Sequence, residues 1–128
     1  MGNQVTNMGG VLSAVTSTIA YTDSGAVTIG TIPANAQIVD VNIDVTTAFN
    51  AASTNTITVG KSGSAAAFVA STSIGSAGRA SVATTGVYSA WADVGSAEVP
   101  VTATYSQTGT AASAGAARVT IVYRSPAP

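Results

Sequence analysis

The chain has 128 residues, with four lysines or arginines, five aspartates or glutamates, and neither histidine nor cysteine. The missing histidine and cysteine exclude a Ser-His-Asp triad, a thiolate nucleophile and any disulfide bond. The net charge of −1 leaves no basic surface for phosphates, and no apolar run approaches the roughly 20 residues of a membrane span, so we expect neither nucleic acid nor a membrane as a partner.

Residues 1–10 predict a flexible arm, because three glycines stand among uncharged polar residues. From residue 11 onward, runs rich in Val, Ile and Thr alternate with turn residues, which is typical of strands. A short proline-containing end follows residue 124. The sequence therefore predicts an arm (1–10), a single domain (11–124) and a tail (125–128).

The predicted strands follow one another along the whole domain. They cover residues 11–22, 27–32, 37–47, 56–60, 65–71, 98–105 and 117–124. The run 65–71 can also form one helical turn, but its β-rich surroundings favour a strand. Residues 75–85 read as a small-residue loop, and no helix longer than a turn or two is expected.

Two strands carry the most specific patterns. In 37–47, Val39, Val41, Ile43 and Val45 alternate with polar residues, which indicates one buried and one wet face. In 98–105, Pro100 cannot donate to a sheet ladder, so an edge strand or a bulge is expected there. With about eight short strands and regular turn signals, the sequence predicts an all-β fold, an antiparallel, jelly-roll-like β-sandwich.

The polar side of strand 37–47 resembles the opening of a calcium loop at Asp40, Asn42 and Asp44. Such a loop needs glycine and glutamate at its sixth and twelfth positions, where this chain has Val45 and Ala51. Two interpretations stay open: the favoured one is a solvent-facing strand, and the other is a weak cation site shared with a neighbouring subunit.

The segment Gly60-Lys61-Ser62 matches the end of a phosphate-binding loop, but Asn55 stands where its first glycine is required. A hairpin turn is the favoured interpretation. None of the acidic residues lies in a context that suggests burial. We therefore predict no catalytic residue, no cofactor and no metal site, and expect that the protein is not an enzyme.

The aromatic residues Tyr88, Trp91, Tyr105 and Tyr123 allow two interpretations. They can form a platform for sugars, or they can be ordinary core and interface residues. With so few aromatic side chains, the core or a subunit interface is favoured.

Residues 29–71 resemble small structural proteins of tailed bacteriophages. The resemblance rests on an Ile-Pro-Ala turn, an alternating Val/Ile strand, a Val-Thr-Thr-Ala-Phe element at 45–49 and a Thr-x-Thr-Val-Gly strand at 56–60. It covers about a third of the chain, and the β-rich segment 118–124 fits the end of such proteins.

The resemblance implies a non-enzymatic virion component, with capsid decoration (cement) proteins as the best match in size. Such proteins are typically β-rich, often trimeric, and bind the outer surface of the shell. The expected partners are the major capsid protein and further copies of the chain in a homotrimer. The expected location is the capsid exterior, after synthesis in the host cytoplasm. A tail or head–tail junction protein and a lectin-like head fibre stay open as alternatives.

The arm supplies the predicted partner contacts, because an extended segment can order on a neighbour by adding a strand to a sheet edge. These residues are Asn3, Gln4, Val5, Asn7 and Met8.

Overall fold

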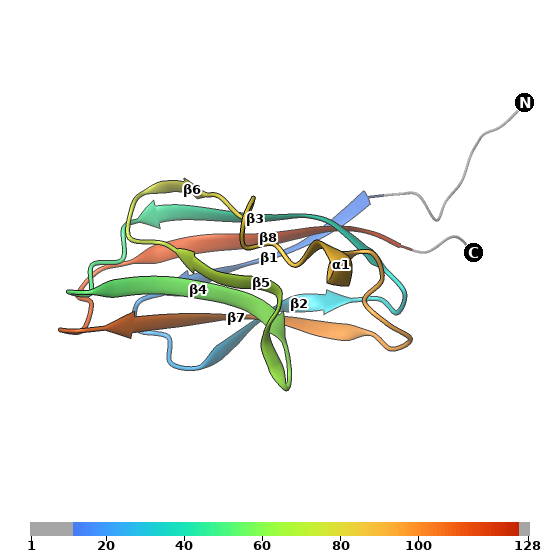
Figure 1. Ribbon diagram of the computed structural model, residues 1–128, viewed down its shortest axis with the longest axis horizontal. Helices are drawn as coiled ribbons and strands as arrows, with labels where there is room; N and C mark the ends of the chain where they lie inside the picture. The colour runs from blue at the N-terminus through green and yellow to red at the C-terminus, as the bar shows by residue number, and fades with distance from the viewer. Residues whose placement is uncertain (1–11, 126–128) are drawn as a thin grey trace, which may run out of the picture.

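The computed structural model describes residues 12–125, which contain eight strands and one short helix (Figure 1). In chain order these are β1 (Leu12–Ala20), β2 (Ala26–Ile32), β3 (Gln37–Thr47), β4 (Thr54–Lys61), β5 (Ser64–Ser73), β6 (Gly78–Ala80), α1 (Tyr88–Trp91), β7 (Val99–Thr108) and β8 (Ala116–Arg124). The predicted arm 1–10, its five candidate contact residues and positions 126–128 lie outside the described residues. Within residues 12–125, no helix has the length and apolar character that crossing a membrane requires.

The strands form two antiparallel four-stranded sheets packed face to face, as Figure 1 shows. Sheet A has the order β1-β8-β3-β6, and sheet B has the order β2-β7-β4-β5. The pairs β1–β8, β2–β7, β3–β6 and β4–β5 are nested, as in one long hairpin rolled into two layers, so the winding is jelly-roll-like. The prediction of an all-β antiparallel sandwich is confirmed.

Strand β3 has the predicted bounds, but one predicted inward residue is wrong. Val41, Ile43 and Val45 are buried, whereas Val39 is 41% exposed. The pairing of β3 with β8 shifts between Ile38 and Asp40, so Val39 is the extra residue of a β-bulge. Ile38 points into the core instead, because the extra residue Val39 shifts the alternation of side chains for the residues that precede it in β3.

Strand β7 corrects a second prediction, because it lies in the middle of sheet B and not at its edge. Pro100 pairs with Thr31 of β2, and the pairing of β7 with β4 begins only at Thr102. The proline therefore lies near the start of the strand, beyond the reach of β4, where its missing N–H breaks no bond to that neighbour. The nearby bulge lies in β2, between Thr28 and Gly30.

The two less regular segments also have defined structures. The run 65–71 lies in strand β5, as favoured. The predicted loop 75–85 contains the three-residue strand β6, which pairs with the end of β3. Helix α1 spans four residues, in agreement with the expectation that helices stay short within the part of the chain that is described.

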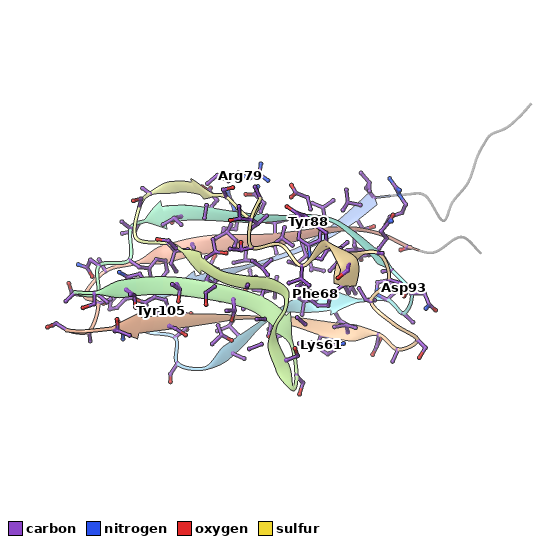
Figure 2. All side chains as sticks on the ribbon, in the orientation of Figure 1. Lys61, Phe68, Arg79, Tyr88, Asp93 and Tyr105 are labelled. Atoms are coloured by element: carbon purple, nitrogen blue, oxygen red, sulfur yellow. The ribbon has the colours of Figure 1, made fainter. Side chains whose placement is uncertain are left out.

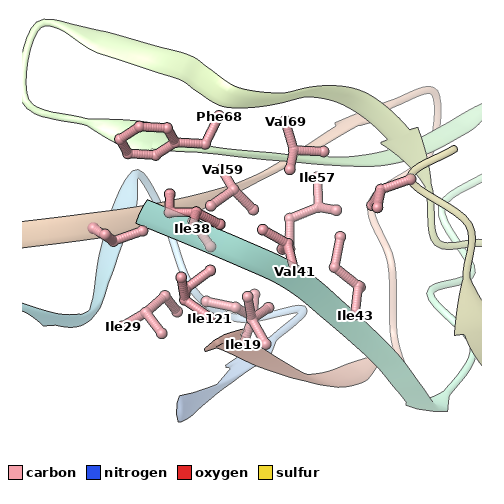
Figure 3. Packing of buried hydrophobic residues seen from close by; sticks show 14 of the residues in the cluster. Ile19, Ile29, Ile38, Val41, Ile43, Ile57, Val59, Phe68, Val69 and Ile121 are labelled. Atoms are coloured by element: carbon pink, nitrogen blue, oxygen red, sulfur yellow. The ribbon is translucent and has the colours of Figure 1, made fainter. Parts of the chain in front are cut away.

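The core lies between the sheets and consists mainly of Val and Ile side chains from both layers (Figure 3). This composition follows from the alternation, since every second residue of a strand points inward. Fully buried side chains with the largest volumes are Phe49, Phe68, Ile19, Ile32, Ile43, Ile57, Ile74 and Ile121. The outer faces carry mostly polar and small residues, with Leu12 and Val39 as exposed apolar exceptions.

Candidate interaction surfaces

The outer face of sheet A carries ion pairs that cross between strands. Asp40 of β3 lies 2.9 Å from the Arg79 guanidinium of β6, and Asp44 lies 3.6 Å from that of Arg118 on β8. All four side chains are about half exposed, so each pair stabilises the fold by only about 0–1 kcal/mol. This arrangement agrees with the favoured interpretation of a solvent-facing strand.

The alternative interpretation, a cation site at Asp40, Asn42 and Asp44, finds no support in this geometry. The two carboxylates each face an arginine, and residues 12–125 contain no cluster of three or more His, Cys, Asp or Glu that could hold a metal ion. Asn42 lies between them, opposite Thr120 in the β3–β8 register, and its Oδ1 atom is buried without a hydrogen-bond partner among the described residues.

Two further carboxylates organise turns. Asp23 accepts a hydrogen bond from the Ala20 N–H at 2.7 Å. Asp93 accepts hydrogen bonds from the Gly95 N–H and from Asn35 Nδ2. Together with the two ion pairs, these contacts occupy four of the five acidic side chains with structural partners.

The outer face of sheet B is different, because hydroxyl side chains cover three of its four strands, β2, β7 and β4. Inward residues such as Ile57, Val59 and Val101 are fully buried, so their neighbours in sequence point outward. We call this surface the hydroxyl face; it comprises Thr28, Thr54, Thr56, Thr58, Thr102, Thr104, Ser106 and Thr108.

The eight residues of the hydroxyl face are all uncharged, whereas the outer face of sheet A carries two ion pairs. Cross-strand pairs such as Thr58–Thr104 and Thr54–Thr108 line up its hydroxyl groups, and Thr54 Oγ1 lies 2.6 Å from Thr108 Oγ1. At its centre, Thr104 Oγ1 is buried and has no hydrogen-bond partner among the described residues. The two faces therefore differ sharply in charge.

A hollow lies between the turn of the β4–β5 hairpin and residues 94–100. Lys61 lies at this hairpin, and its backbone pairs with Ser64, so the interpretation of Gly60-Lys61-Ser62 as a hairpin turn is confirmed. A Cβ atom at Gly60 would collide with the Ser64 carbonyl, which explains the glycine. The hollow has a volume of about 400 Å³, and its lining includes Lys61 and Glu98.

The aromatic side chains do not form one platform. Trp91 is buried and donates its indole N–H to the Phe68 carbonyl at 2.8 Å, while Tyr88 packs edge-on against it. Tyr105 lies at the other end of the sandwich, where it packs against Phe49, and burial raises its pKa (Figure 2). The favoured interpretation as core residues is confirmed for Trp91 and Tyr105, and Tyr88 is the exposed member of the set.

Sequence reasoning found the solvent-facing side of strand 37–47 but missed its ion pairs and the hydroxyl face, although a signal existed for the hydroxyl face. Threonine at every second position in 54–58, and Thr or Ser at every second position in 102–108, already mark two outward hydroxyl rows. The ion pairs left no such local signal, because Asp40 and Arg79 are brought together only by the pairing of β3 with β6.

Comparison with known proteins gives one informative similarity, and it lies in the fold. No protein-family model and no curated protein sequence matches the chain. The structure is similar to a solved structure described as "Cyanophage Pam1 capsid asymmetric unit", with a TM-score of 0.70 and 19% sequence identity. The similarity covers 98% of this chain and 93% of that chain, so it extends over the whole sandwich.

Proposed function

We propose that this chain is a non-enzymatic structural protein of a tailed-phage virion, and that it binds and stabilises the outer surface of the capsid as a decoration protein. The observation that carries the proposal is the fold similarity to a chain of a cyanophage capsid unit, which extends over nearly the full length of both chains. The short length of the chain and its resemblance to tailed-phage structural proteins add support.

The side chains that could perform chemistry support a structural role as well. Four of the five carboxylates hold an arginine or a turn, and the chain has no histidine or cysteine to act as base or nucleophile. Function then depends on surfaces, and the hydroxyl face is an uncharged surface formed by three strands. The cores of protein interfaces are depleted of charge, so we assign this face to the contact with the major capsid protein.

A homotrimer fits this role for a physical reason. A closed three-fold ring matches a shell position of the same symmetry. Three small contacts on one ring bind far more tightly than a single contact, because the second and third form at high effective concentration. Newly made protein would assemble in the host cytoplasm and end on the capsid exterior.

A reconstruction of the virion, combined with the copy number of the chain per particle, tests this proposal. We expect density of this sandwich on the outer surface of the shell and a fixed ratio to the major capsid protein. Only a few copies per particle would place the chain in the tail or at the head–tail junction. A shell exterior without this density would overturn the decoration role.

A substitution on the hydroxyl face tests the assigned contact. Ser106 is exposed, so Ser106→Lys should leave the fold intact. If the face is buried against the shell, the new charge loses water without gaining a partner, and affinity for shells should fall at least about tenfold. The measurement is co-sedimentation of purified protein with empty shells.

Thr46→Lys is the matched control, because Thr46 is also exposed but lies at the end of β3 in sheet A. This variant should bind shells with unchanged affinity. Equal losses in both variants, or no loss in Ser106→Lys, would remove the hydroxyl face as the contact surface.

A further inference from the structure

Strand β1 forms an edge of sheet A, and no described strand pairs with its outer side. Along its other side, within the sheet, β1 pairs with β8 in an unbroken register, from Leu12 opposite Arg124 to Ala20 opposite Ala116. An edge strand presents a row of N–H and C=O groups that can bind a further strand. The question is which of these groups are free.

The hydrogen bonds just beyond the strand show which residues face outward. The Tyr21 N–H donates to the Gly115 carbonyl at 3.1 Å, and this pair continues the β1–β8 register. In an antiparallel ladder, bonded pairs alternate with unbonded ones. The odd-numbered residues of β1 therefore bond to β8, and the backbone groups of the even-numbered residues point away from it.

Asp23 confirms this direction and closes one end of the edge. Its carboxylate accepts the outward Ala20 N–H at 2.7 Å, and its own N–H donates to the Ala20 carbonyl at 3.0 Å. The outward groups of Leu12, Ala14, Thr16 and Thr18 are hydrogen-bonded to no strand among the described residues. The open stretch thus covers residues 12–18.

The other three sheet edges each carry a feature that hinders pairing. Strand β6 has three residues and an arginine, and β2 contains a bulge. The middle of β5 is bonded along its outer side, where the Ala70 N–H donates to the Thr85 carbonyl and the Val87 N–H to the Phe68 carbonyl. Strand β1 has nine residues, with neither charge nor proline, so it lacks the usual protection of an edge.

We propose that the open edge of β1 binds the N-terminal arm, residues 1–10, of a second copy of this chain, as an added antiparallel strand. The lengths agree: the open stretch of residues 12–18 is about 20 Å long, and an extended arm of residues 1–10 spans up to about 33 Å. The arm has no charged side chain, and neither has the edge, so no charge opposes the pairing.

The arm of another copy fits this edge better than the arm of the same chain. A return of the same chain uses residues near Gly9 and Gly10 for a tight turn, whereas a neighbouring copy can lay its whole arm along the edge. Exchange gives each copy one arm and one edge, so a ring of copies leaves none unpaired. The inference rests on the oligomer of the proposed function.

Residue-resolved amide hydrogen exchange in the purified full chain, at several concentrations, tests this pairing. We expect the amides of Ala14, Thr16 and Thr18 to exchange at least about tenfold more slowly than in a chain lacking residues 1–10. The amides of Ser17 and Ile19 bond to β8 and should stay protected in both proteins. The protection of the even-numbered amides should fall on dilution, because a second copy supplies the arm.

Fast exchange of the three amides in the full chain at every concentration would overturn the proposal. Protection that is independent of concentration would assign the edge to the arm of the same chain, and protection that survives removal of the arm would assign it to another segment. Shells play no part in this measurement, so its failure is distinct from a failure of the decoration role.

A pair of proline variants adds a matched test of the register. Ala14→Pro removes an outward N–H, so the fold should persist while the amides of Thr16 and Thr18 exchange as in the armless chain. Ser13→Pro removes an N–H that bonds to β8 and should lower the unfolding midpoint instead. Equal effects of the two substitutions on stability would contradict the assigned direction of the backbone groups.

Discussion

Replacing Phe49 with alanine is expected to lower the free energy of unfolding by about 3–5 kcal/mol, a large part of the total stability of a small domain. The Phe49 side chain is 1% exposed, and its ring centroid lies 4.7 Å from that of Tyr105. Removing the ring leaves a cavity between the sheets, because the strands on both sides are held by their ladders and cannot collapse into it. Urea unfolding at equilibrium gives the change.

The neighbourhood of Phe49 explains why the site cannot adapt. The chain crosses from sheet A to sheet B here, and the Phe49 N–H donates to the Ile74 carbonyl at 3.3 Å. Gly115 lies against the ring so closely that a Cβ atom there would collide with it. Phe49→Leu is the matched control and should cost less than about 1.5 kcal/mol, since it keeps most of the buried volume. A loss below about 1 kcal/mol in Phe49→Ala would show that the ring does not fill the core.

Replacing Trp91 with alanine is expected to cost a similar amount, about 3–5 kcal/mol, for a related reason. Trp91 is 6% exposed, and its indole covers the edge of the core beside Phe68 and Tyr88. The substitution removes this cover together with the hydrogen bond from the indole N–H to the Phe68 carbonyl. The Val87 N–H still donates to that carbonyl, so the lost volume accounts for most of the effect.

Trp91→Phe separates the structural role of this residue from a role in binding. It keeps most of the volume and loses one hydrogen bond, so the expected cost is about 0.5–1.5 kcal/mol. Because the indole is buried, shell binding and host adsorption should be unchanged in this variant. A folded Trp91→Phe protein with reduced host adsorption would favour the lectin-like head fibre over a decoration protein.

The strands were largely predictable from the sequence, and particular residues show why. The alternation in 37–47 reflects backbone geometry alone, because successive side chains of a strand point to opposite faces. The same reasoning placed the strand at 117–124, which agrees closely with β8. It failed at Val39, since a bulge depends on how the strand pairs with its neighbour and not on its own residues.

The interaction surfaces were less predictable, because they depend on strands that are distant in sequence. Pro100 suggested an edge strand or a bulge, yet β7 lies inside sheet B, and the proline is accommodated where β4 has already ended. The nearby bulge is in β2. The Asp40–Arg79 pair and the hydroxyl face arise in the same way, from neighbours that the chain brings together only on folding.

By itself, the sequence determined which reactive residue types this protein has. It also determined that its strands alternate between buried and exposed side chains. Both are local properties: a residue type is present or absent, and alternation follows from the pleat of an extended backbone. Only the tertiary structure decided which strands are neighbours, which hydroxyl rows share a face, that Phe49 fills the core from a loop, and that β1 keeps an open edge. These features follow from long-range pairing, in which the free energy of burying both sheets together selects one register among many that each strand alone would allow.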